Sequence, residues 1–264
     1  MAGAARLRSS PLISLAIANQ KGGVGKSTTS ANLAAELALR GEKVLLIDGD
    51  SRRTATRIVA RPGEAKTSLA DVLLPPDGRP SSLDEVVMKT QVVGLDLVPA
   101  TVQLANFDRE GYSALLRLKE FLTGARRRYD FAVIDTPPNL GMLVSATMAA
   151  VDHVIVCVQA EPEAFAGIGD LLQLIKVAQA SNRRLSVLGA LCTMYDARTS
   201  VGPQVYEALR KQFPGRTFQT IIDRQVRISE CPSVHQPIQL HAPKSRGARQ
   251  YGELAAEILR LLKK

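Results

Sequence analysis

The residues with the clearest chemistry form a glycine-rich stretch at positions 20–29, which reads Gln-Lys-Gly-Gly-Val-Gly-Lys-Ser-Thr-Thr. Its glycines let the backbone approach a polyphosphate closely and turn N–H groups toward it. In such a loop Lys26 would supply a full charge at the β- and γ-phosphates, and the Ser27 hydroxyl can ligate Mg²⁺. An apolar run precedes the stretch and a helical pattern follows it, as a phosphate-binding loop requires. The alternative, a glycine-rich turn with solvated lysines, explains less of this context.

The stretch departs from the usual G-x-x-x-x-G-K-[ST] pattern at its first two positions. Gln20 stands where the pattern has glycine, and Lys21 adds a second lysine. Lys21 is poorly placed to reach the γ-phosphate of its own nucleotide from the side that Lys26 occupies. It would reach a nucleotide held by a facing subunit, which hints at a face-to-face dimer.

Carboxylates follow two other apolar runs. The run 44–47 is followed by Asp48 and Asp50, and the run 131–134 by Asp135. Carboxylates at the C-terminal ends of parallel strands face the crevice where ligands bind. Asp135 has the Walker B arrangement and would hold Mg²⁺ through water, Asp48 would organise the Mg²⁺ waters, and Asp50 would orient the attacking water. The alternatives are a loop-capping pair and a strand-end turn.

Strands and helices that position these residues alternate along the chain. Apolar runs predict strands at 12–18, 44–47, 95–99, 131–134, 154–158, 185–192 and 217–222. Helical patterns cover 28–40, 69–74, 83–87, 112–128, 142–150, 164–180, 201–213 and 247–262. This alternation predicts an α/β fold with a mostly parallel central sheet and helices on both faces. We expect one domain over 12–264, after a short, disordered basic tail at 1–11.

The composition agrees with one α/β domain and argues against several kinds of site and cellular compartment. The chain has 264 residues, of which 45% are hydrophobic, enough for a sizeable core. Cys157, Cys192 and Cys231 are far apart and no CxxC occurs, which argues against a disulfide framework and against zinc or iron–sulfur sites. No apolar run approaches the ~18 residues of a membrane span, and the N-terminus lacks the apolar region of a secretory signal. A cytoplasmic setting is the default.

The charge of the chain is uneven. The net charge is +9, and residues 198–264 hold 12 Lys/Arg against 5 Asp/Glu. A basic C-terminal quarter favours a polyanion partner, although a solvated surface that aids solubility is the alternative. Because aromatic residues are 4% and tryptophan is absent, phosphate-backbone contact on duplex DNA fits better than base stacking on single strands.

The loop resembles the deviant Walker A loop of the ParA/MinD superfamily of P-loop ATPases. The resemblance extends over roughly residues 12–262. The segments at 44–50, 129–150, 156–172, 191–200 and 224–251 are similar to those of ParA/Soj-type chromosome and plasmid partition ATPases. The later segments favour that branch over MinD-type proteins.

The resemblance implies roles for five residues already singled out. Lys21 would be the signature lysine that crosses to the partner's nucleotide, and Lys26 the catalytic phosphate lysine. Asp50 would position the hydrolytic water, with Asp48 and Asp135 around Mg²⁺. ATP and Mg²⁺ are then the cofactors, and the implied ATP-binding residues are Gly22, Gly23, Val24, Gly25, Lys26, Ser27 and Thr28.

The resemblance also implies partners. The ATP-bound homodimer would bind duplex DNA without sequence preference, and a ParB-like centromere-binding protein would stimulate slow hydrolysis and release. The protein would then be cytoplasmic and nucleoid-associated, with no stable membrane association. For each basic residue taken alone, a solvated surface charge is the alternative. The residues that match DNA-contacting positions of relatives, or lie next to them, are Arg198, Arg224, Arg227, Lys244 and Arg246.

The chain departs from this family pattern at two places. Ser51-Arg52-Arg53-Thr54 stands where relatives usually have Pro-Gln-Gly-Asn, which bears on the switch loop and adds basic charge near the dimer seam. Asp223 stands where relatives usually have proline, near the expected adenine pocket.

Other functions compete with partition of DNA. A positioning ATPase on the same scaffold would carry a protein cargo in place of a centromere. A MinD-like membrane-surface ATPase would use the C-terminal helix, although so short a helix more often packs on its own domain. The intact loop argues against a DNA-binding protein with a dead nucleotide site. The absence of CxxC argues against a metal-cluster carrier, and the absence of a tyrosine-rich tail against a tyrosine kinase.

Overall fold

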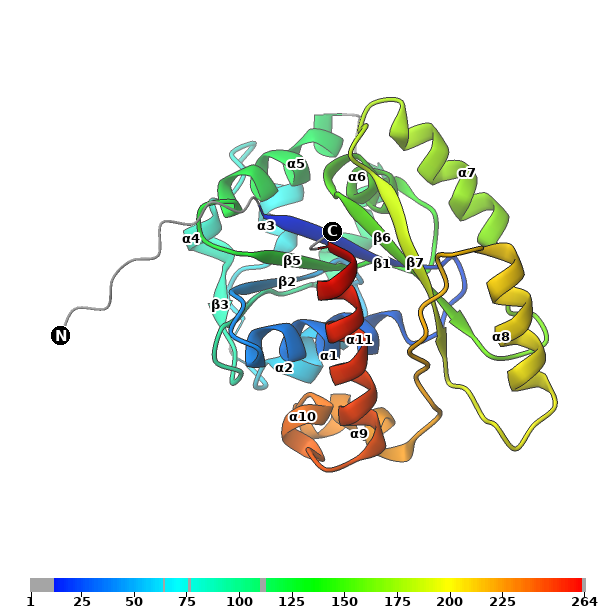
Figure 1. Cartoon of the computed structure of the whole chain (residues 1–264). Helices are drawn as coiled ribbons and strands as arrows, with labels where there is room; N and C mark the ends of the chain where they lie inside the picture. Colours follow the sequence, from blue (N-terminus) through cyan, green and yellow to red (C-terminus); the bar gives the residue numbers. More distant parts are fainter. Residues whose placement is uncertain (1–11, 64, 76, 110–112, 263–264) are drawn as a thin grey trace.

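A seven-stranded sheet forms the centre of the protein in the computed structural model, which describes residues 12–63, 65–75, 77–109 and 113–262. The strand order is β3-β4-β2-β5-β1-β6-β7, and each neighbouring pair is parallel except β3 and β4 (Figure 1). The predicted mostly parallel sheet is therefore confirmed, whereas the predicted tail at 1–11 lies outside the described residues. The strands are β1 (Ile13–Ala18), β2 (Val44–Asp48), β3 (Met88–Lys89), β4 (Leu95–Val98), β5 (Phe131–Asp135), β6 (His153–Gln159) and β7 (Ser186–Thr193).

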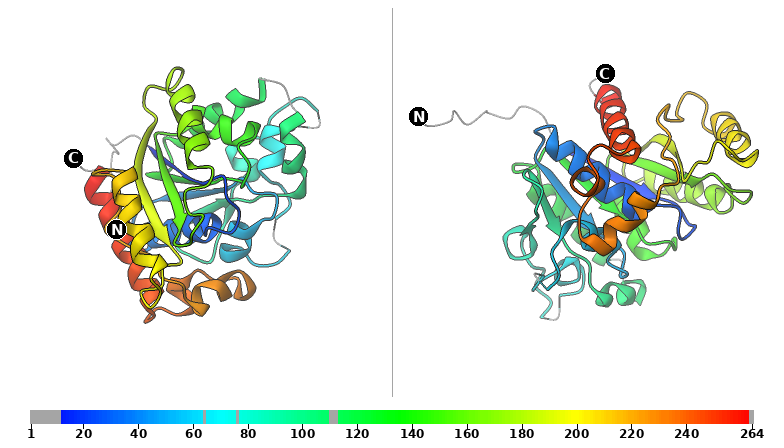
Figure 2. Two further views of the ribbon diagram at one scale, coloured as in Figure 1. Left: turned by 90° about the vertical axis from the view of Figure 1, so that its right-hand side faces the viewer. Right: turned by 90° about the horizontal axis from the view of Figure 1, so that it is seen from below.

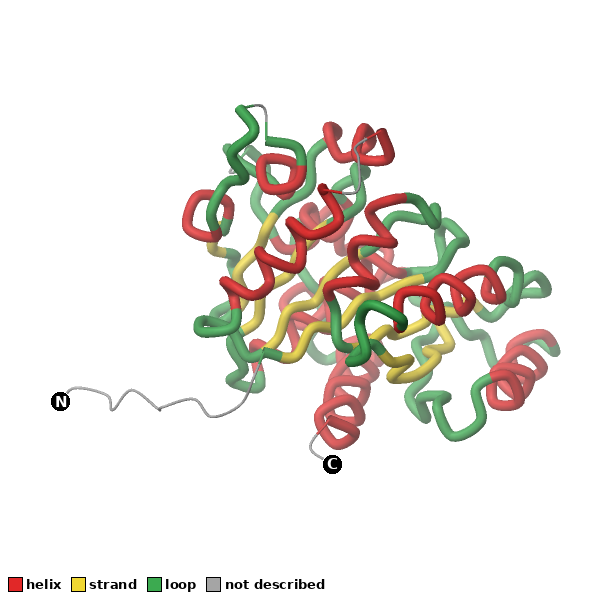
Figure 3. The backbone as a smooth tube through the Cα atoms, turned by 90° about the horizontal axis from the view of Figure 1, so that it is seen from above, coloured by secondary structure: helices red, strands yellow, loops and turns green. Residues whose placement is uncertain are grey.

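Helices cover both faces of this sheet, as predicted. One face carries α1, α2, α9, α10 and α11, and the other carries α3, α5, α6, α7 and α8 (Figure 1); Figure 3 shows helices of the second face crossing over the strands. The helices are α1 (Lys26–Leu39), α2 (Thr54–Val59), α3 (Leu69–Leu73), α4 (Leu83–Val86), η1 (Val102–Arg109, a 3₁₀ helix), α5 (Ser113–Ala125), α6 (Met142–Ala150), α7 (Ile168–Gln179), α8 (Val201–Gln212), α9 (Val226–Val234), α10 (Ile238–His241) and α11 (Arg246–Leu262).

Strand β1 shows why the central strands are apolar throughout. Leu15 and Ile17 are buried in the core that contains α1, whereas Ala16 and Ala18 are buried in the core on the opposite face. Because successive side chains of a strand point to opposite faces, a sheet covered on both sides needs apolar residues at every position.

Helix α11 crosses and contacts α1 and covers the apolar face below the sheet (Figure 2, right). Leu254 and Ile258 are fully buried there, which confirms the prediction that this helix packs on its own domain. Within the described residues, the structure contains no helix of sufficient length and apolarity to cross a bilayer.

The predicted strand at 217–222 is wrong. Residues 217–222 make one isolated bridge to β7, between Thr217 and Ala190, and single hydrogen bonds such as Phe218 N–H to the Ala190 carbonyl at 3.0 Å. The Glu257 carboxylate of α11 instead accepts hydrogen bonds from the backbone N–H groups of Gln219 and Thr220, at 2.8 and 3.0 Å. These N–H groups bind a side chain, so the segment does not continue the sheet.

The sequence also did not reveal several short elements. Helices α2, α9 and α10, the two-residue β3 and the 3₁₀ helix η1 fall in segments that carried no clear periodic pattern. Helix α7 begins at Ile168 and not at 164, because Gly167 has a left-handed backbone (φ 76°) that interrupts the helix.

His153, the first residue of β6, gives the protein a titratable group on the sheet. Burial lowers the pKa of His153, and its Nδ1 lies 2.9 Å from the Ser186 hydroxyl of β7. In the unfolded chain the pKa returns to about 6.5, so the unfolded state takes up the proton first as pH falls. His153 therefore lowers stability as pH falls through 6.5. Melting temperatures at pH 7.5 and 5.5 should fall more for wild type than for His153→Gln, and an equal fall in both proteins would contradict this assignment.

Candidate active site

The glycine-rich loop leaves β1 and is tied to the next two strands. The Asn19 side chain donates to the Cys157 carbonyl of β6 at 2.6 Å, and the Thr193 hydroxyl of β7 donates to the Val24 carbonyl at 2.8 Å. Gly25 adopts a left-handed backbone (φ 85°) immediately before α1, which L side chains rarely adopt. Gly22 and Gly23 are exposed, so their backbone faces solvent at the start of the helix. The loop is thus held open for an anion at the α1 N-terminus.

Lys26, the first residue of α1, points its ammonium group back into this loop. It is 4% exposed, and its Nζ donates to the Lys21 carbonyl at 2.9 Å. Burial lowers the pKa of Lys26, and the nearby Asp135 carboxylate opposes this effect. A buried cation at a helix N-terminus favours a bound anion.

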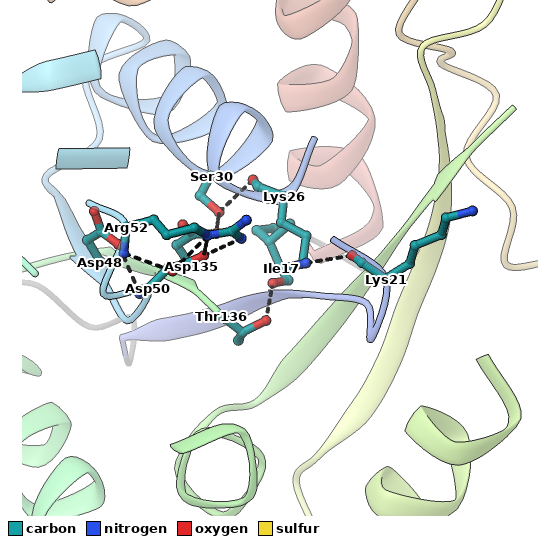
Figure 4. A network of polar contacts seen from close by, with 9 residues as sticks. All are labelled: Ile17, Lys21, Lys26, Ser30, Asp48, Asp50, Arg52, Asp135 and Thr136. Carbon is teal, nitrogen blue, oxygen red and sulfur yellow. Dashed lines mark hydrogen bonds and ion pairs between the residues drawn. The ribbon is translucent and has the colours of Figure 1, made fainter. Parts of the chain in front are cut away.

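Two carboxylates lie side by side because of the sheet register. Asp48 of β2 and Asp135 of β5 are paired residues, and both are fully buried (Figure 4). Burial and the neighbouring Asp48 raise the pKa of Asp135 well above its usual range, and a hydrogen bond from the Ser27 side chain opposes the rise. The Ser30 hydroxyl donates to Asp135 Oδ1 at 3.1 Å, whereas Asp135 Oδ2 is buried without a hydrogen-bond partner in the described structure.

Asp48 has more protein partners than Asp135. Its Oδ2 accepts from both the N–H and the hydroxyl of Thr56, each at 2.7 Å, and its Oδ1 accepts from the Asp50 N–H at 3.1 Å. Burial raises the pKa of Asp48 to about 6. Asp48 therefore fixes the start of α2 as well as facing the site. Gly49 is required between the two aspartates, since a Cβ there would lie 2.6 Å from the Asp135 carbonyl oxygen.

Asp50 is bound by an arginine two residues later. The Arg52 Nη2 atom lies 2.6 Å from Asp50 Oδ2, and its Nε lies 3.0 Å from the same oxygen. The Asp50 carboxylate is 2% exposed, whereas the Arg52 side chain is 53% exposed. Figure 4 shows the Arg52 side chain extending past the carboxylates toward Lys26. The next residue, Arg53, has a left-handed backbone (φ 61°) at the position where the sequence pattern of relatives has glycine.

The donors around this site fit Mg²⁺ bound together with phosphate. Mg²⁺ in proteins usually takes one or two carboxylates, several waters and phosphate oxygens. The Asp135 Oδ2 atom has no hydrogen-bond partner in the described structure and lies next to Asp48 and the Ser27 side chain. These groups together offer hard oxygen ligands at the end of the phosphate loop. Within the described residues no group of three or more His, Cys, Asp or Glu residues has the arrangement of a complete metal cage. The arrangement therefore suits a metal that arrives with a nucleotide.

Lys21 points away from this cluster (Figure 4). Its ammonium group forms an ion pair with Glu161 and lies 3.8 Å from the Glu163 carboxylate, both in the turn after β6. The hydrogen bond to Glu161 raises the pKa of Lys21. That Lys21 reaches a nucleotide held by a facing subunit stays a prediction.

A mostly apolar cavity of about 420 Å³ opens beside the loop. Thr28 and Gly25 line one side, and Ile222, Asp223 and Tyr251 line the other. A planar base fits a cavity of this size and character, next to the loop that would hold its phosphates. The Asp223 carboxylate at its edge pairs with Arg246 at 2.6 Å.

The basic residues predicted to contact DNA come from segments that meet at one edge of the molecule. A backbone bridge between Tyr195 and Asp223 joins the loop of Arg198 to the segment of Arg224. The Gln225 side chain accepts from the Gly247 N–H at 2.9 Å and joins that segment to the start of α11. Arg227 is on α9, Lys244 is exposed in the turn before α11, and Arg246 begins α11.

Three carboxylates partly neutralise this basic edge. Arg198 pairs with Asp196 at 2.7 Å, and Arg227 pairs with Glu230 at 3.0 Å. The hydrogen bonds from Arg198 lower the pKa of Asp196 to about 2. Together with the Asp223 pair, these contacts mean that a polyanion would have to compete with carboxylates of the same chain.

Several residues that shape the site were not identified from the sequence. The hydroxyl groups of Ser30, Thr56 and Thr193 hold Asp135, Asp48 and the loop, respectively. Their partners are 105, 8 and 169 residues away along the chain, so no local pattern marked the first or the last. Thr56 is close enough to Asp48 that a loop-capping role was a detectable signal.

Comparisons with known proteins extend over nearly the whole chain. A family model described as an AAA domain matches residues 13–187. The sporulation initiation inhibitor protein Soj of Bacillus subtilis is 41% identical over 249 residues, covering 92% of this chain and 97% of that protein. The chromosome partitioning protein ParA of Caulobacter vibrioides is 39% identical over 260 residues, covering 96% of each chain.

Solved structures share the fold and carry nucleotide. A Mycobacterium smegmatis structure named cobyrinic acid a,c-diamide synthase, with a bound ATP analogue and magnesium, is 31% identical with a TM-score of 0.82, covering 96% of each chain. The septum site-determining protein MinD of Pyrococcus horikoshii, complexed with Mg-ADP, is 24% identical with a TM-score of 0.78, covering 95% of this chain and 97% of that chain. The Soj and ParA relatives are the more similar in sequence.

Proposed function

The chain belongs to the Soj/ParA family of chromosome-partitioning ATPases, and from that premise we propose that it is a DNA-partition ATPase switched by its nucleotide. ATP binding joins two copies in a sandwich dimer, the dimer binds duplex DNA without sequence preference, and hydrolysis releases it. The observation that carries this proposal is the convergence of Lys26, Asp50 and Asp135 at the end of the glycine-rich loop. The protein would work in the cytoplasm on the nucleoid.

Each group in the site has a place in this reaction. The backbone of the loop and the Lys26 ammonium bind the β- and γ-phosphates, and the base enters the cavity beside Thr28 and Tyr251. Ser27 and Asp135 would hold Mg²⁺, with Asp48 ordering its waters. Mg²⁺, when bound, supplies charge neutralisation at the phosphates. Asp50 orients the water that attacks the γ-phosphate.

The dimer is needed because one subunit does not complete the site. Lys21 is directed away from its own Lys26 and is held by Glu161. In a face-to-face pair, Lys21 would exchange this carboxylate for the triphosphate of the partner subunit. The triphosphate of ATP carries more negative charge than one carboxylate, and more than the diphosphate of ADP. ATP therefore favours the exchange more than ADP does.

Replacing Lys21 with alanine should abolish the ATP-dependent dimer and leave ATP binding to the monomer within about threefold of wild type, because the ammonium does not face its own site. Light scattering with size-exclusion chromatography, in ATP and in ADP, measures the dimer. Lys119→Ala, which removes an exposed lysine of α5, is the matched control. An intact ATP-dependent dimer in the Lys21 variant would contradict the proposed arrangement.

DNA binding would follow from dimer formation. Two copies double the number of basic residues at the edge that carries Arg198, Arg224 and Arg246, and counterion release then favours DNA. A ParB-like centromere-binding protein would stimulate the slow hydrolysis. The test is a DNA titration with ATP, ADP or no nucleotide at two salt concentrations. Tight binding only with ATP, weakened by salt, supports the proposal, whereas equal binding with ADP and ATP opposes it.

Two other candidates use the same scaffold. A positioning ATPase would have the same switch with a protein cargo, and only its partner would differ. A MinD-like membrane-surface ATPase would need the apolar side of α11, but Leu254 and Ile258 are buried against the domain. Sedimentation with anionic liposomes and ATP distinguishes that candidate from the partition ATPase.

A further inference from the structure

Arg52 occupies the part of the site that departs from the family pattern. Besides the two bonds of its guanidinium to Asp50 Oδ2, its Nε lies 3.2 Å from Asp50 Oδ1 and its backbone N–H lies 3.0 Å from the same oxygen. Because the turn between residues 50 and 53 is short, both the guanidinium and the backbone N–H of Arg52 contact the Asp50 carboxylate. A planar guanidinium that binds both oxygens of a carboxylate makes one of the stronger side-chain pairs.

The guanidinium also affects the other charged groups of the site. The hydrogen bonds to Asp50 raise the pKa of Arg52, and the Asp135 and Asp48 carboxylates add to this rise. Arg52 in turn adds to the lowering of the Lys26 pKa that burial causes. Figure 4 shows it directed from the Asp50 loop toward the end of α1. It is thus a cation that interacts electrostatically with all three aspartates, including Asp135, which would hold Mg²⁺.

Arg52 has room to leave this position. Its side chain is about half exposed, and it borders a cavity of about 310 Å³ that is also lined by Leu104, Pro137 and Pro138. Asp50, by contrast, is held in the closed turn after β2 and remains in place. A competing cation can therefore displace the guanidinium without unfolding the turn.

We propose that Arg52 is a positioning residue that acts as an internal counter-cation: it holds Asp50 in the nucleotide-free protein and must be displaced when Mg²⁺ enters with the nucleotide. This inference rests on the proposed function, because it concerns the same metal and nucleotide. Its consequence is that the chain needs more Mg²⁺ to bind nucleotide than the same chain without the guanidinium. Arg52 thereby sets the Mg²⁺ concentration at which the site loads.

The test measures ADP affinity by calorimetry across a series of Mg²⁺ concentrations, and again with EDTA. Arg52→Gln should lower the Mg²⁺ concentration for half-maximal tightening about three- to tenfold, the size expected for a half-exposed, bidentate pair. Arg52→Lys keeps the charge but loses the bidentate geometry, so its midpoint should lie between those of wild type and Arg52→Gln. Arg53→Gln, which removes an exposed neighbouring charge, should not shift the midpoint.

Three results would overturn the inference. The first is an equal midpoint in Arg52→Gln and wild type. The second is ADP binding that weakens by the same factor with Mg²⁺ and with EDTA, which would make Arg52 a phosphate ligand. The third is a midpoint shift in Arg53→Gln as large as that in Arg52→Gln, which would make the effect one of general charge. A wild type that binds no ADP under any of these conditions overturns the proposed function as well.

Discussion

Lys26→Ala is expected to weaken ATP binding at least about a hundredfold and, with it, to abolish hydrolysis and ATP-dependent DNA binding. The ammonium is almost fully buried beside the loop, so it meets the phosphates in a region of low dielectric. Hydrogen bonds to charged groups contribute about 1.5–3 kcal/mol each, and an ammonium that contacts two phosphates makes more than one. Calorimetry with ATP, phosphate release and DNA titration measure the three losses.

The control for this variant is Lys119→Ala, which keeps the composition of the site and removes the same functional group elsewhere. Thermal melting without nucleotide checks that both variants are folded. ATP-dependent DNA binding that survives in Lys26→Ala would mean that the glycine-rich loop is not the switch, and the proposed function would fail.

Asp50→Ala should separate ATP binding and dimer formation from ATP hydrolysis and release of DNA. ATP binding and the dimer are expected to persist, because Asp50 lies outside the phosphate loop and its role is to orient water. Loss of a group that positions a nucleophile typically lowers the rate about a hundredfold or more. Without hydrolysis, the ATP dimer should remain on DNA longer than wild type does. Phosphate release and the dissociation rate from DNA after dilution are the measurements.

Removal of Asp50 also frees Arg52, so the same variant carries a second change at the site. Asp50→Asn keeps the shape of the side chain and part of its hydrogen bonding. It should also lose hydrolysis, because it removes the negative charge of the carboxylate. Hydrolysis at the wild-type rate in both variants would exclude Asp50 as the water-orienting residue.

Much of the fold was predictable because the sheet is covered on both faces. Each central strand is then a continuous apolar run followed by polar residues, and the aspartates at the ends of β2 and β5 mark the crevice without further information. The family resemblance is confirmed by relatives about 40% identical over most of the chain. The crossing of Lys21 to a partner subunit stays a prediction.

The contacts that the sequence did not reveal are mainly those between distant segments. The 217–222 run has strand composition, but Glu257 of α11 takes up its N–H groups, and nothing near residue 217 signals this. Arg52 was noted only as a departure from the family pattern, since its hold on Asp50 depends on how the turn after β2 closes. The base cavity likewise joins residues from four separate segments.

The link between Glu257 and the 219–220 backbone has a consequence for how the protein is made. One wall of the base cavity, at Ile222 and Asp223, follows directly on this segment, which is held by single hydrogen bonds to β7 and by the Glu257 carboxylate of α11. A nascent chain that has emerged from the ribosome only as far as residue 245 has all seven strands and the complete phosphate loop, but it lacks Glu257 and Tyr251. During translation, the phosphate-binding loop would therefore form before the base cavity is complete. Selective binding of an adenine nucleotide would be among the last properties that the growing polypeptide gains.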